Sequence, residues 1–531
     1  MLKNLVLIVK TYHDFIRTGC KDSITRNTSR LNNLFEAVSN SYIPMLQMFG
    51  RLESEGIQFK IGLVLPPVLC SMLENPKVQE LYVEFLDKRI ALGKKELTSN
   101  KEDQKALEIA KNTIERFKEL KSAFTDKYNS NLITAFAEYQ QKGYVEILAT
   151  CATQMFMPHY ADLEEAISAQ IEIGLQAYKK SFGEIPEGFY LPECGYTPGI
   201  EKIIKAYGYS YTILDSRSVL FTDNIPVNGI FYPVRTDNSL IIYSSDPIVK
   251  ERVENEEGYY SDSTYRNENR DIGFELDPKK LTPVMEEKSA RYSTGFKYWK
   301  KDFSEEADVT YDEKAALEKA QEDADDFVTA IDECLTKAAE YSSGVDFVNS
   351  VCVLNENLLR KHWFEYIAWL ENVIRGAEKA GLNLSVCRRM VAKPFLLEKI
   401  NPYYSSSAGD GYGENLLSSR NCWMMRYVRK ATERMIDLAE RFPSDTGLKT
   451  RLLNIGSVEL LLAQSSSLAA MIDADDDEAF AEERFRLSIN AFTTVFDSLG
   501  SNTVSTEWLT TLENLDNLFP WINYKVFSVK K

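Results

Sequence analysis

The chain has 531 residues, of which 44% are hydrophobic and 27% are charged, a composition typical of globular proteins and too apolar for a disordered chain. Lys and Arg total 62 and Asp and Glu total 79, so the net charge is −17. An acidic surface repels phosphate backbones, which argues against a nucleic-acid partner but leaves neutral ligands such as sugars open.

The cysteines and the apolar segments indicate the cellular setting. Eight cysteines are scattered without a C-x-x-C pair, which predicts reduced thiols. The N-terminus has an apolar run of only five residues before Lys10, which is too short for a signal peptide. The most apolar long stretch, 453–472, contains Glu459, Gln464 and the consecutive serines 465–467, and does not fit a membrane span. We therefore expect a soluble, cytoplasmic protein.

Short apolar runs alternate with longer helical patterns in the first three quarters of the chain. Continuous β-rich runs separated by helices are typical of parallel strands buried on both faces, so an α/β barrel or an open α/β sheet is expected. The predicted strands are LVLIV (5–9), IGLVL (61–65), VEILA (145–149), GFYL (188–191), YTIL (211–214), LIIYS (240–244) and VNSVCVLN (348–355).

The predicted helices divide into three groups by position. Those between the strands lie at 161–181, 198–207, 312–342 and 356–380. The segment 75–140 is too long for one crossover helix and predicts a helical insertion. After residue 396 the strand pattern disappears, and a separate helical domain is expected with helices over 416–443, 446–471, 478–499 and 505–515.

Two further segments are distinctive without indicating a cofactor. Residues 245–310 form a long, polar, Tyr-rich stretch of the kind that often serves as a lid. The acidic DADDDE (473–478) lacks the glycine and distal Glu of a calcium loop, and is expected to cap a helix instead. Only three histidines exist, and no two share a helix turn, so neither a metal nor a cofactor is predicted.

The most informative segment is GFYLPECGYTPG (188–199), which places Glu193 directly after a buried strand. Catalytic side chains of α/β barrels lie at the carboxyl ends of the strands, so Glu193 is a candidate active-site residue. The alternative interpretation is a strand-end carboxylate that bonds the backbone, and position alone leaves both open.

This segment resembles the nucleophile motif of glycoside hydrolase family 57, and the resemblance to the family's α-1,4-glucan branching enzymes extends over nearly the whole chain. It implies an incomplete (β/α)7 barrel over 1–74 and 141–395, a helical insertion over 75–140 and a C-terminal helical domain over 396–531. The other matching segments, in family order, include LPPVLCSMLENPKVQELYVEFLDKR (65–89), KGYVEILATCATQMFMP (142–158), YRNENRDIGFELD (265–277), TGFKYW (294–299), AEERFR (481–486) and NLFPWINYKVF (517–527).

The chemistry that the resemblance implies is retaining transglycosylation of an α-glucan or maltooligosaccharide. One carboxylate attacks the anomeric carbon while a second carboxylic acid protonates the leaving oxygen. Glu193 matches the nucleophile, whereas the position of the general acid is Asn355, an amide that cannot supply this proton. Loss of a positioned general acid costs about 10² to 10⁴ in rate. The neighbouring Glu356 could act as a displaced acid if the strand ends before it.

Several other family residues differ, and some are retained. Residues that match substrate-binding positions of the family are Tyr196, Asp215, Tyr259 and Trp363. The positions where the resemblance implies a glycine, histidine, tryptophan or aspartate that this chain lacks are Lys10, Tyr12, Gln154, Arg217, Arg360, Lys361, His362, Ser407, Ser467 and Leu468.

Three hypotheses follow. The leading one is a branching-enzyme homologue that is inactive or severely impaired and binds α-glucan or has a regulatory role. The second is an active transglycosylase that uses Glu193 with a displaced acid. The third is a structural or regulatory partner that has lost sugar binding, since the cleft has lost tryptophans that would stack on sugar rings.

Overall fold

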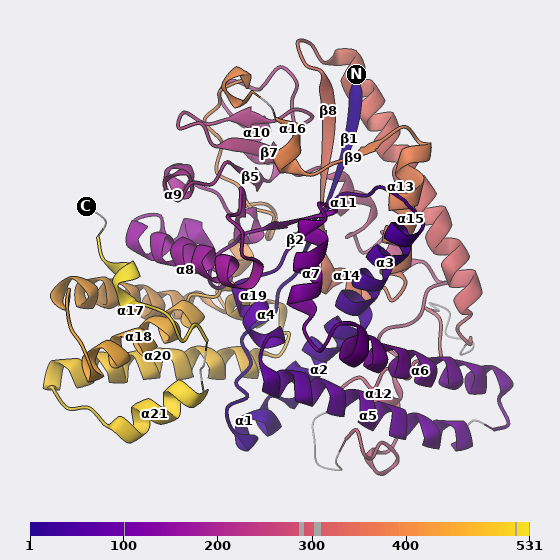
Figure 1. Cartoon of the computed structure of the whole chain (residues 1–531), viewed down its shortest axis with the longest axis horizontal. Coiled ribbons are helices and arrows are strands. Elements are labelled where there is room, and N and C mark those ends of the chain that lie inside the picture. Colours follow the sequence, from indigo (N-terminus) through magenta and orange to yellow (C-terminus); the bar gives the residue numbers. More distant parts are fainter. Residues whose placement is uncertain (100, 286–290, 302–308, 392, 516–517, 530–531) are drawn as a thin grey trace.

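Seven parallel strands form the centre of the computed structural model, which describes residues 1–99, 101–285, 291–301, 309–391, 393–515 and 518–529 (Figure 1). Around the ring the order is β1, β2, β3, β4, β5, β7, β8 and back to β1. Two single bridges, Ala149 to Phe189 and Ser245 to Val351, join the two sheets. The strands are β1 (Leu2–Lys10), β2 (Ile61–Val64), β3 (Val145–Leu148), β4 (Gly188–Tyr190), β5 (Tyr211–Leu214), β7 (Ile241–Ser244) and β8 (Phe347–Asn355).

The ring confirms the predicted fold class, and each predicted strand overlaps one of its seven members. Two short strands, β6 (Val234–Arg235) and β9 (Asn383–Leu384), pair at the side of β7 and β1. The strands are buried on both faces, as β1 illustrates: Val6 and Ile8 belong to the inner cluster, whereas Leu5 and Leu7 pack with the surrounding helices. This double burial explains why the strands appear as continuous apolar runs.

Helices that follow the strands cover the outside of the ring and lie close to the predicted ranges. They are α8 (Glu164–Phe182), α9 (Ile200–Ala206), α13 (Glu313–Tyr341), α14 (Glu356–His362) and α15 (Tyr366–Lys379). Three helices that the sequence did not predict, α1 (Lys21–Arg26), α2 (Thr28–Ala37) and α3 (Ile43–Ser54), precede β2, with a π-helical turn η1 (Val38–Tyr42) between the last two. In α2 the Thr, Ser and Asn residues weaken the helical pattern.

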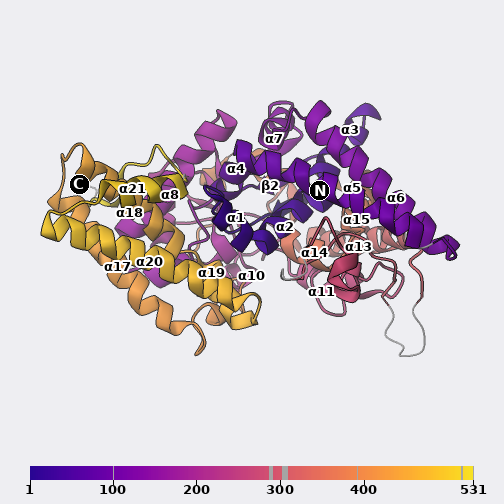
Figure 2. The same ribbon diagram turned by 90° about the horizontal axis from the view of Figure 1, so that it is seen from below.

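The stretch predicted as an insertion contains α5 (Pro76–Ser99), α6 (Gln104–Ser122) and α7 (Leu132–Gln141). Asp103 caps α6 by accepting the backbone N–H groups of Lys105 and Ala106. The α5–α6 hairpin projects from one side of the ring, opposite the C-terminal helices (Figures 1 and 2).

The C-terminal region consists of helices, as predicted, but one of them is divided. The single helix expected over 446–471 is two, α18 (Leu448–Ala463) and α19 (Ser466–Ala474), which meet at Ser465. The other helices are α17 (Cys422–Arg441), α20 (Glu478–Ser501) and α21 (Thr506–Leu515). Asp477 precedes α20, but its side chain makes no capping hydrogen bond and lies 2.8 Å from Arg30 Nε instead.

The Tyr-rich stretch 245–310 lies beside the ring as short helices and loops, with 286–290 and 302–308 outside the described residues. Its elements are α11 (Ile248–Arg252), η5 (Tyr259–Ser261), α12 (Ile272–Glu275) and η6 (Pro278–Lys280). The remaining short elements are α4 (Pro67–Leu73), η2 (Ala123–Lys127), η3 (Met157–Tyr160), η4 (Pro192–Cys194), α10 (Ser216–Leu220), α16 (Cys387–Met390), η7 (Pro394–Leu396), η8 (Glu414–Leu416) and η9 (Tyr524–Phe527). Among the described helices, none has both the length and the apolar character needed to cross a membrane.

Candidate active site

Glu193 lies in a single 3-10 turn, Pro192–Cys194, just beyond the carboxyl end of β4. Its backbone is in the left-handed region (φ 52°, ψ 28°), as is that of Cys194 (φ 48°), a conformation that non-glycine residues rarely adopt. The Glu193 carbonyl accepts hydrogen bonds from Ser407 N, at 2.7 Å, and Ser406 Oγ, at 2.9 Å. These bonds hold the turn so that its carboxylate is at the rim of the ring.

Three side chains surround the Glu193 carboxylate, and each is at a position that the sequence comparison by motif predicts to differ from the family. Lys10 Nζ, at the end of β1, lies 3.1 Å from Oε2, and Ser407 Oγ lies 3.4 Å from the same oxygen. Gln154 Nε2 donates to Oε1 at 3.2 Å. The Glu193 side chain is 26% exposed and that of Lys10 is 16% exposed, so solvent reaches the pair only in part.

The charges of this group are mutually stabilised. Burial raises the pKa of Glu193, but the Lys10 ammonium and the hydrogen bonds from Lys10, Gln154 and Ser407 outweigh it and hold the pKa below its ordinary value. Burial lowers the pKa of Lys10, but the carboxylates of Glu193 and Glu254 raise it by more. Both groups are therefore ionised at neutral pH, and Glu193 is held in an ion pair.

Asn355 lies beside this pair, and the structure adds a carboxyl group that the sequence analysis missed. Asn355 ends β8 and is the register partner of Lys10 in β1. Its backbone N–H donates to Glu254 Oε1 at 2.5 Å. Burial raises the pKa of Glu254 above its ordinary value. The Lys10 ammonium lowers this pKa, and the Glu193 carboxylate raises it. Four glutamates occur within 251–257, and nothing in the sequence distinguished this one.

Glu356 does not join this group, although the strand ends before it. It begins α14 and is completely buried, where Oε1 accepts hydrogen bonds from Ser41 Oγ, at 2.5 Å, and Arg360 Nε, at 3.0 Å. A carboxylate so paired stabilises the junction of α14 with η1. The idea of Glu356 as a displaced acid is therefore wrong.

Two of the predicted binding residues lie near the Glu193 turn. Asp215 follows β5 and caps α10 by accepting the Arg217 N–H at 3.1 Å. Burial raises the pKa of Cys194 to about 11, and the charge of Asp215 contributes to this rise. Tyr196 pairs through its backbone with Ser405 and donates its hydroxyl to Glu201 Oε2 at 2.9 Å. Both residues therefore bond to the segments around the Glu193 turn.

The other two predicted binding residues have different surroundings. The Tyr259 hydroxyl donates to Asp326 Oδ2, on α13, at 2.6 Å. Trp363 is completely buried, with ring centroids of Tyr265 and Trp369 at 5.2 and 5.4 Å. The expectation that Trp363 is a substrate-binding residue is wrong, because the chain becomes extended after α14 and turns the indole into the core.

A second group of side chains joins the ring to the C-terminal helices. The Tyr12 hydroxyl donates to Asp14 Oδ1 at 2.7 Å and lies 2.8 and 3.0 Å from Ser465 Oγ and Ser467 Oγ. Tyr12 therefore links the end of β1 to the start of α19. Arg217 Nη1 donates to the Ser406 carbonyl at 3.4 Å.

Comparisons with known proteins agree in the family they indicate. A family model described as "Glycosyl hydrolase family 57" matches residues 23–338, and one described as "1,4-alpha-glucan branching enzyme, C-terminal" matches residues 427–527. A 1,4-alpha-glucan branching enzyme of Thermococcus kodakarensis is 26% identical over 482 residues, which cover 85% of this chain and 68% of the relative.

Solved structures show the same architecture. The alpha-amylase AmyC of Thermotoga maritima has a TM-score of 0.91 at 28% identity, with 100% of both chains covered. A family 57 type branching enzyme of Pyrococcus horikoshii has a TM-score of 0.86 at 22% identity, covering 99% of this chain and 97% of that one. The fold is therefore shared over the full length.

Proposed function

The chain belongs to glycosyl hydrolase family 57 and is branching-enzyme-like, and from this we propose that it is a branching-enzyme homologue with severely impaired or absent turnover that binds an α-glucan or has a regulatory role. The relative named as a 1,4-alpha-glucan branching enzyme supports the substrate class.

The ion pair of Glu193 with Lys10 is the observation that supports this proposal most directly. A retaining nucleophile attacks an anomeric carbon that acquires positive charge in the transition state. The Lys10 ammonium, 3.1 Å from the attacking oxygen, competes for its lone pairs and opposes that charge. At an effective dielectric constant of 20, two unit charges 4 Å apart interact by about 4 kcal/mol, so this opposition is substantial.

The acid position adds a second defect. Asn355 presents an amide where the family has an acid, and Glu356 is engaged with Arg360. Restoring the acid alone leaves Lys10 in place. We therefore expect Asn355→Asp by itself to restore no activity.

The test is incubation of the purified protein with amylose, followed by debranching and chain-length analysis, with Glu193→Gln and Asn355→Asp in parallel. We expect no branches above background from any of the three. Branches made by the wild type and lost in Glu193→Gln would overturn the proposal, as would robust activity of Asn355→Asp. Calorimetric titration with maltoheptaose tests glucan binding, and its absence would favour a partner that no longer binds sugar.

Glu254 favours a second candidate function, an active transglycosylase with a displaced acid. In that scheme Glu193 attacks the anomeric carbon and Glu254 gives its proton to the departing oxygen. The incoming sugar hydroxyl then returns a proton to Glu254 as it displaces Glu193. Activity that is lost in Glu254→Gln but kept in Glu251→Gln, its exposed neighbour, would support this scheme.

A further inference from the structure

A pocket of about 530 Å³ is formed by the stretch 227–231, by α11 and by the carboxyl-terminal half of α13 (Figure 1). Its volume lies within the range of roughly 300 to 1,000 Å³ that small-molecule sites occupy. Lys10, Gln154 and Ser407, which surround the Glu193 carboxylate, do not line it. The pocket is therefore separate from the candidate active site.

Hydrogen bonds join the walls of the pocket to one another and to the ring. Ser343 N donates to Asn228 Oδ1 at 3.1 Å, which ties the stretch 227–231 to the end of α13. Asn349 N, in β8, donates to the Phe231 carbonyl at 2.8 Å, which ties the same stretch to the ring. The pocket is thus already formed in the free protein, and little of the chain has to be ordered when a ligand binds.

The lining of the pocket is apolar at its base and aromatic at its edge. Ile248 from α11 and Ala338 from α13 are buried. Tyr341, the last residue of α13, also lines the pocket, yet it is 84% exposed. An accessible aromatic ring offers a flat apolar face to a ligand and a hydroxyl that can form a hydrogen bond. Such an edge suits a ligand that has both apolar and polar surface.

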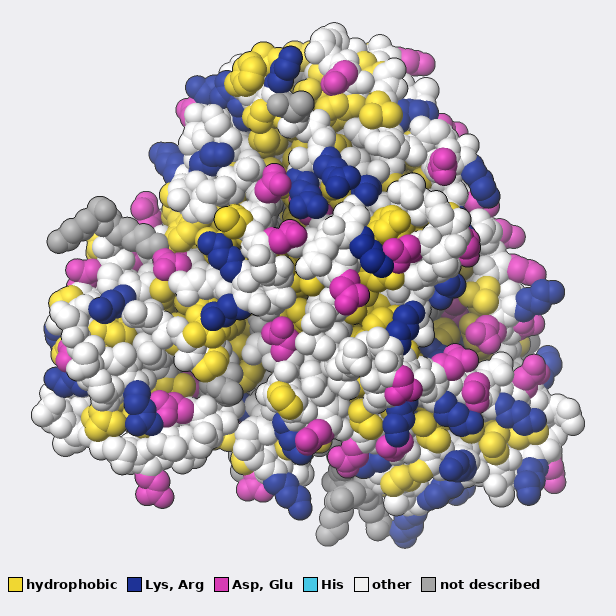
Figure 3. Space-filling view, viewed as in Figure 1, with side chains coloured by type: hydrophobic (Ala, Val, Ile, Leu, Met, Phe, Trp, Pro, Cys, Tyr) yellow, Lys and Arg dark blue, Asp and Glu magenta, His cyan; other side chains and the backbone are white. Residues whose placement is uncertain are grey.

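Charged side chains of both signs line the pocket, namely Glu251, Arg252, Glu333 and Lys337. The two carboxylates oppose the two cations, and Arg252 also pairs with Asp326. On the face of the molecule in Figure 3, Lys and Arg are likewise interspersed with Asp and Glu over the α5–α6 hairpin at the lower right. The pocket therefore has no large excess of either charge, which favours a neutral ligand.

We propose that this pocket binds a neutral α-glucan segment, with the ring of Tyr341 packed against a glucose unit. The choice of an α-glucan rests on the function proposed above. A glucose unit has a face of C–H groups that packs on an aromatic ring, and hydroxyl groups at its edge that bond polar side chains. The Glu333 carboxylate can accept such bonds, and the Lys337 ammonium and the Asn228 amide can donate them.

The helix α11 connects the pocket to the candidate active site. Ile248 and Arg252 of this helix line the pocket. Lys250 Nζ, on the same helix, donates to the Ser407 carbonyl at 2.8 Å, and Glu254 follows the helix by two residues. A glucan bound in the pocket would therefore contact the helix that also reaches the Glu193 group.

Calorimetric titration of the full-length protein with maltoheptaose tests the proposal. We expect saturable binding that is unchanged at about 0.5 M NaCl, because the ligand is neutral. Binding should be at least tenfold weaker in Tyr341→Ala and nearly retained in Tyr341→Phe, which keeps the ring. Tyr427→Ala, at another exposed tyrosine, should bind as the wild type does. Equal melting temperatures of the three variants and the wild type would show that the loss is one of binding.

The thiol of Cys334 provides a readout that needs no variant. Cys334 lines the pocket and is half-buried, whereas Cys422 is exposed. Burial raises the pKa of Cys334, so alkylation with iodoacetamide is best followed at about pH 8.5, where more thiolate is present. We expect about 10 mM maltoheptaose to slow alkylation of Cys334 at least threefold and to leave that of Cys422 unchanged, as measured by mass spectrometry.

The outcomes separate this proposal from the proposed function. Binding that is undiminished in Tyr341→Ala and leaves Cys334 unprotected would overturn the pocket as the site and leave glucan binding intact. Protection of Cys334 in a protein that also branches amylose would support the pocket and overturn the proposed loss of turnover. Absence of saturable binding would overturn the proposal and favour a partner that no longer binds sugar.

Discussion

The Lys10 ammonium and the Glu193 carboxylate form an ion pair whose side chains are 16% and 26% exposed. Lys10→Met would leave the carboxylate partly buried without its countercharge, so the pKa of Glu193 should rise. Because the pair is partly solvated, we expect a loss of only about 1 to 3 kcal/mol in the free energy of unfolding. Urea unfolding of the variant measures this loss.

A double-mutant cycle separates the interaction energy of the Lys10–Glu193 pair from the other effects of each substitution. Lys10→Met and Glu193→Gln together should cost less than the sum of the two single changes by about 1 kcal/mol or more. The exposed pair Lys77 and Glu80 is the control and should couple by no more than about 0.5 kcal/mol. If the stability losses of the two single variants were additive, the ion pair between Lys10 and Glu193 would be contradicted.

The site was predictable from sequence only where a residue's position in a strand determines its place. Glu193 follows a β-rich run, and parallel strands bring their carboxyl ends to one rim, so its location was expected. Glu254 lies in an irregular stretch, where no periodicity predicts direction. Trp363 was misassigned because a sequence pattern does not show whether an aromatic ring after a helix turns into the core.

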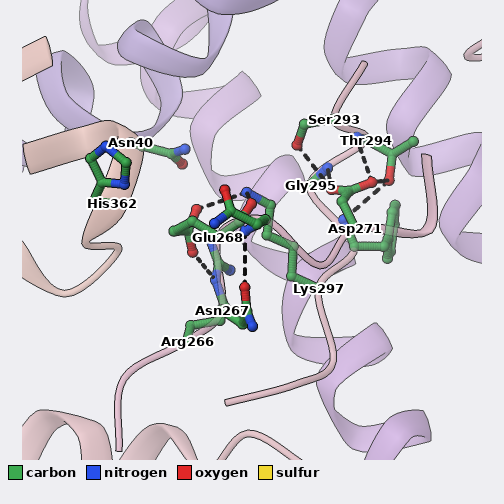
Figure 4. A network of polar contacts seen from close by, with 12 residues as sticks. Asn40, Arg266, Asn267, Glu268, Asp271, Ser293, Thr294, Gly295, Lys297 and His362 are labelled. Carbon is green, nitrogen blue, oxygen red and sulfur yellow. Dashed lines mark hydrogen bonds and ion pairs between the residues drawn. The ribbon is translucent and has the colours of Figure 1, made fainter. Parts of the chain in front are cut away.

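At the scale of elements, buried polar groups hold together the described loops around α12 in the stretch 265–297. Asp271 Oδ1 accepts the backbone N–H groups of Gly273 and Thr294, and Oδ2 accepts that of Gly295 (Figure 4). Glu268 joins Arg266 to Lys297 across the same loop. This dependence on side chains explains why the fold of the stretch was not predicted, whereas the doubly buried strands were.

The loop should lose stability in acid because of Glu268. Its pKa falls from an ordinary 4.5 to about 2 in the folded protein. The contribution of the carboxylate is therefore fully present above about pH 4.5 and is lost as the pH falls towards 2, amounting to about 3 kcal/mol. In urea unfolding between pH 6 and pH 3, Glu268→Gln should show a shallower acid dependence than the wild type. The exposed Glu115→Gln should retain the wild-type slope, and a wild-type slope in Glu268→Gln would contradict the assignment.

At the scale of the whole molecule, the C-terminal helices contribute to the candidate site as well as to the fold. Ser466 donates its N–H and its hydroxyl to the Gln154 carbonyl, at 2.7 and 2.6 Å, and Gln154 contacts Glu193. Thr153 donates to the Leu461 carbonyl at 2.6 Å. The position of Gln154 therefore depends on both parts of the chain.

The ion pair between Arg17 and Glu459 is one of the charged links between these parts. Arg17 Nη2 lies 3.0 Å from Glu459 Oε1, and the Glu459 side chain is fully buried in α18. Removing one partner of a buried pair costs about 3 to 5 kcal/mol, and we expect the lower end because Arg484 remains 3.7 Å from Glu459.

In calorimetry the wild type should melt in one transition. Arg17→Met should melt with a van't Hoff enthalpy below the calorimetric enthalpy, because the C-terminal helices then separate from the barrel before the barrel unfolds. Arg451→Met, which breaks an exposed pair with Glu513 within the helical region, should leave the two enthalpies equal. Two transitions in the wild type would show that the barrel and the helices fold independently, and Gln154 would then lack the support that the contacts of Ser466 imply.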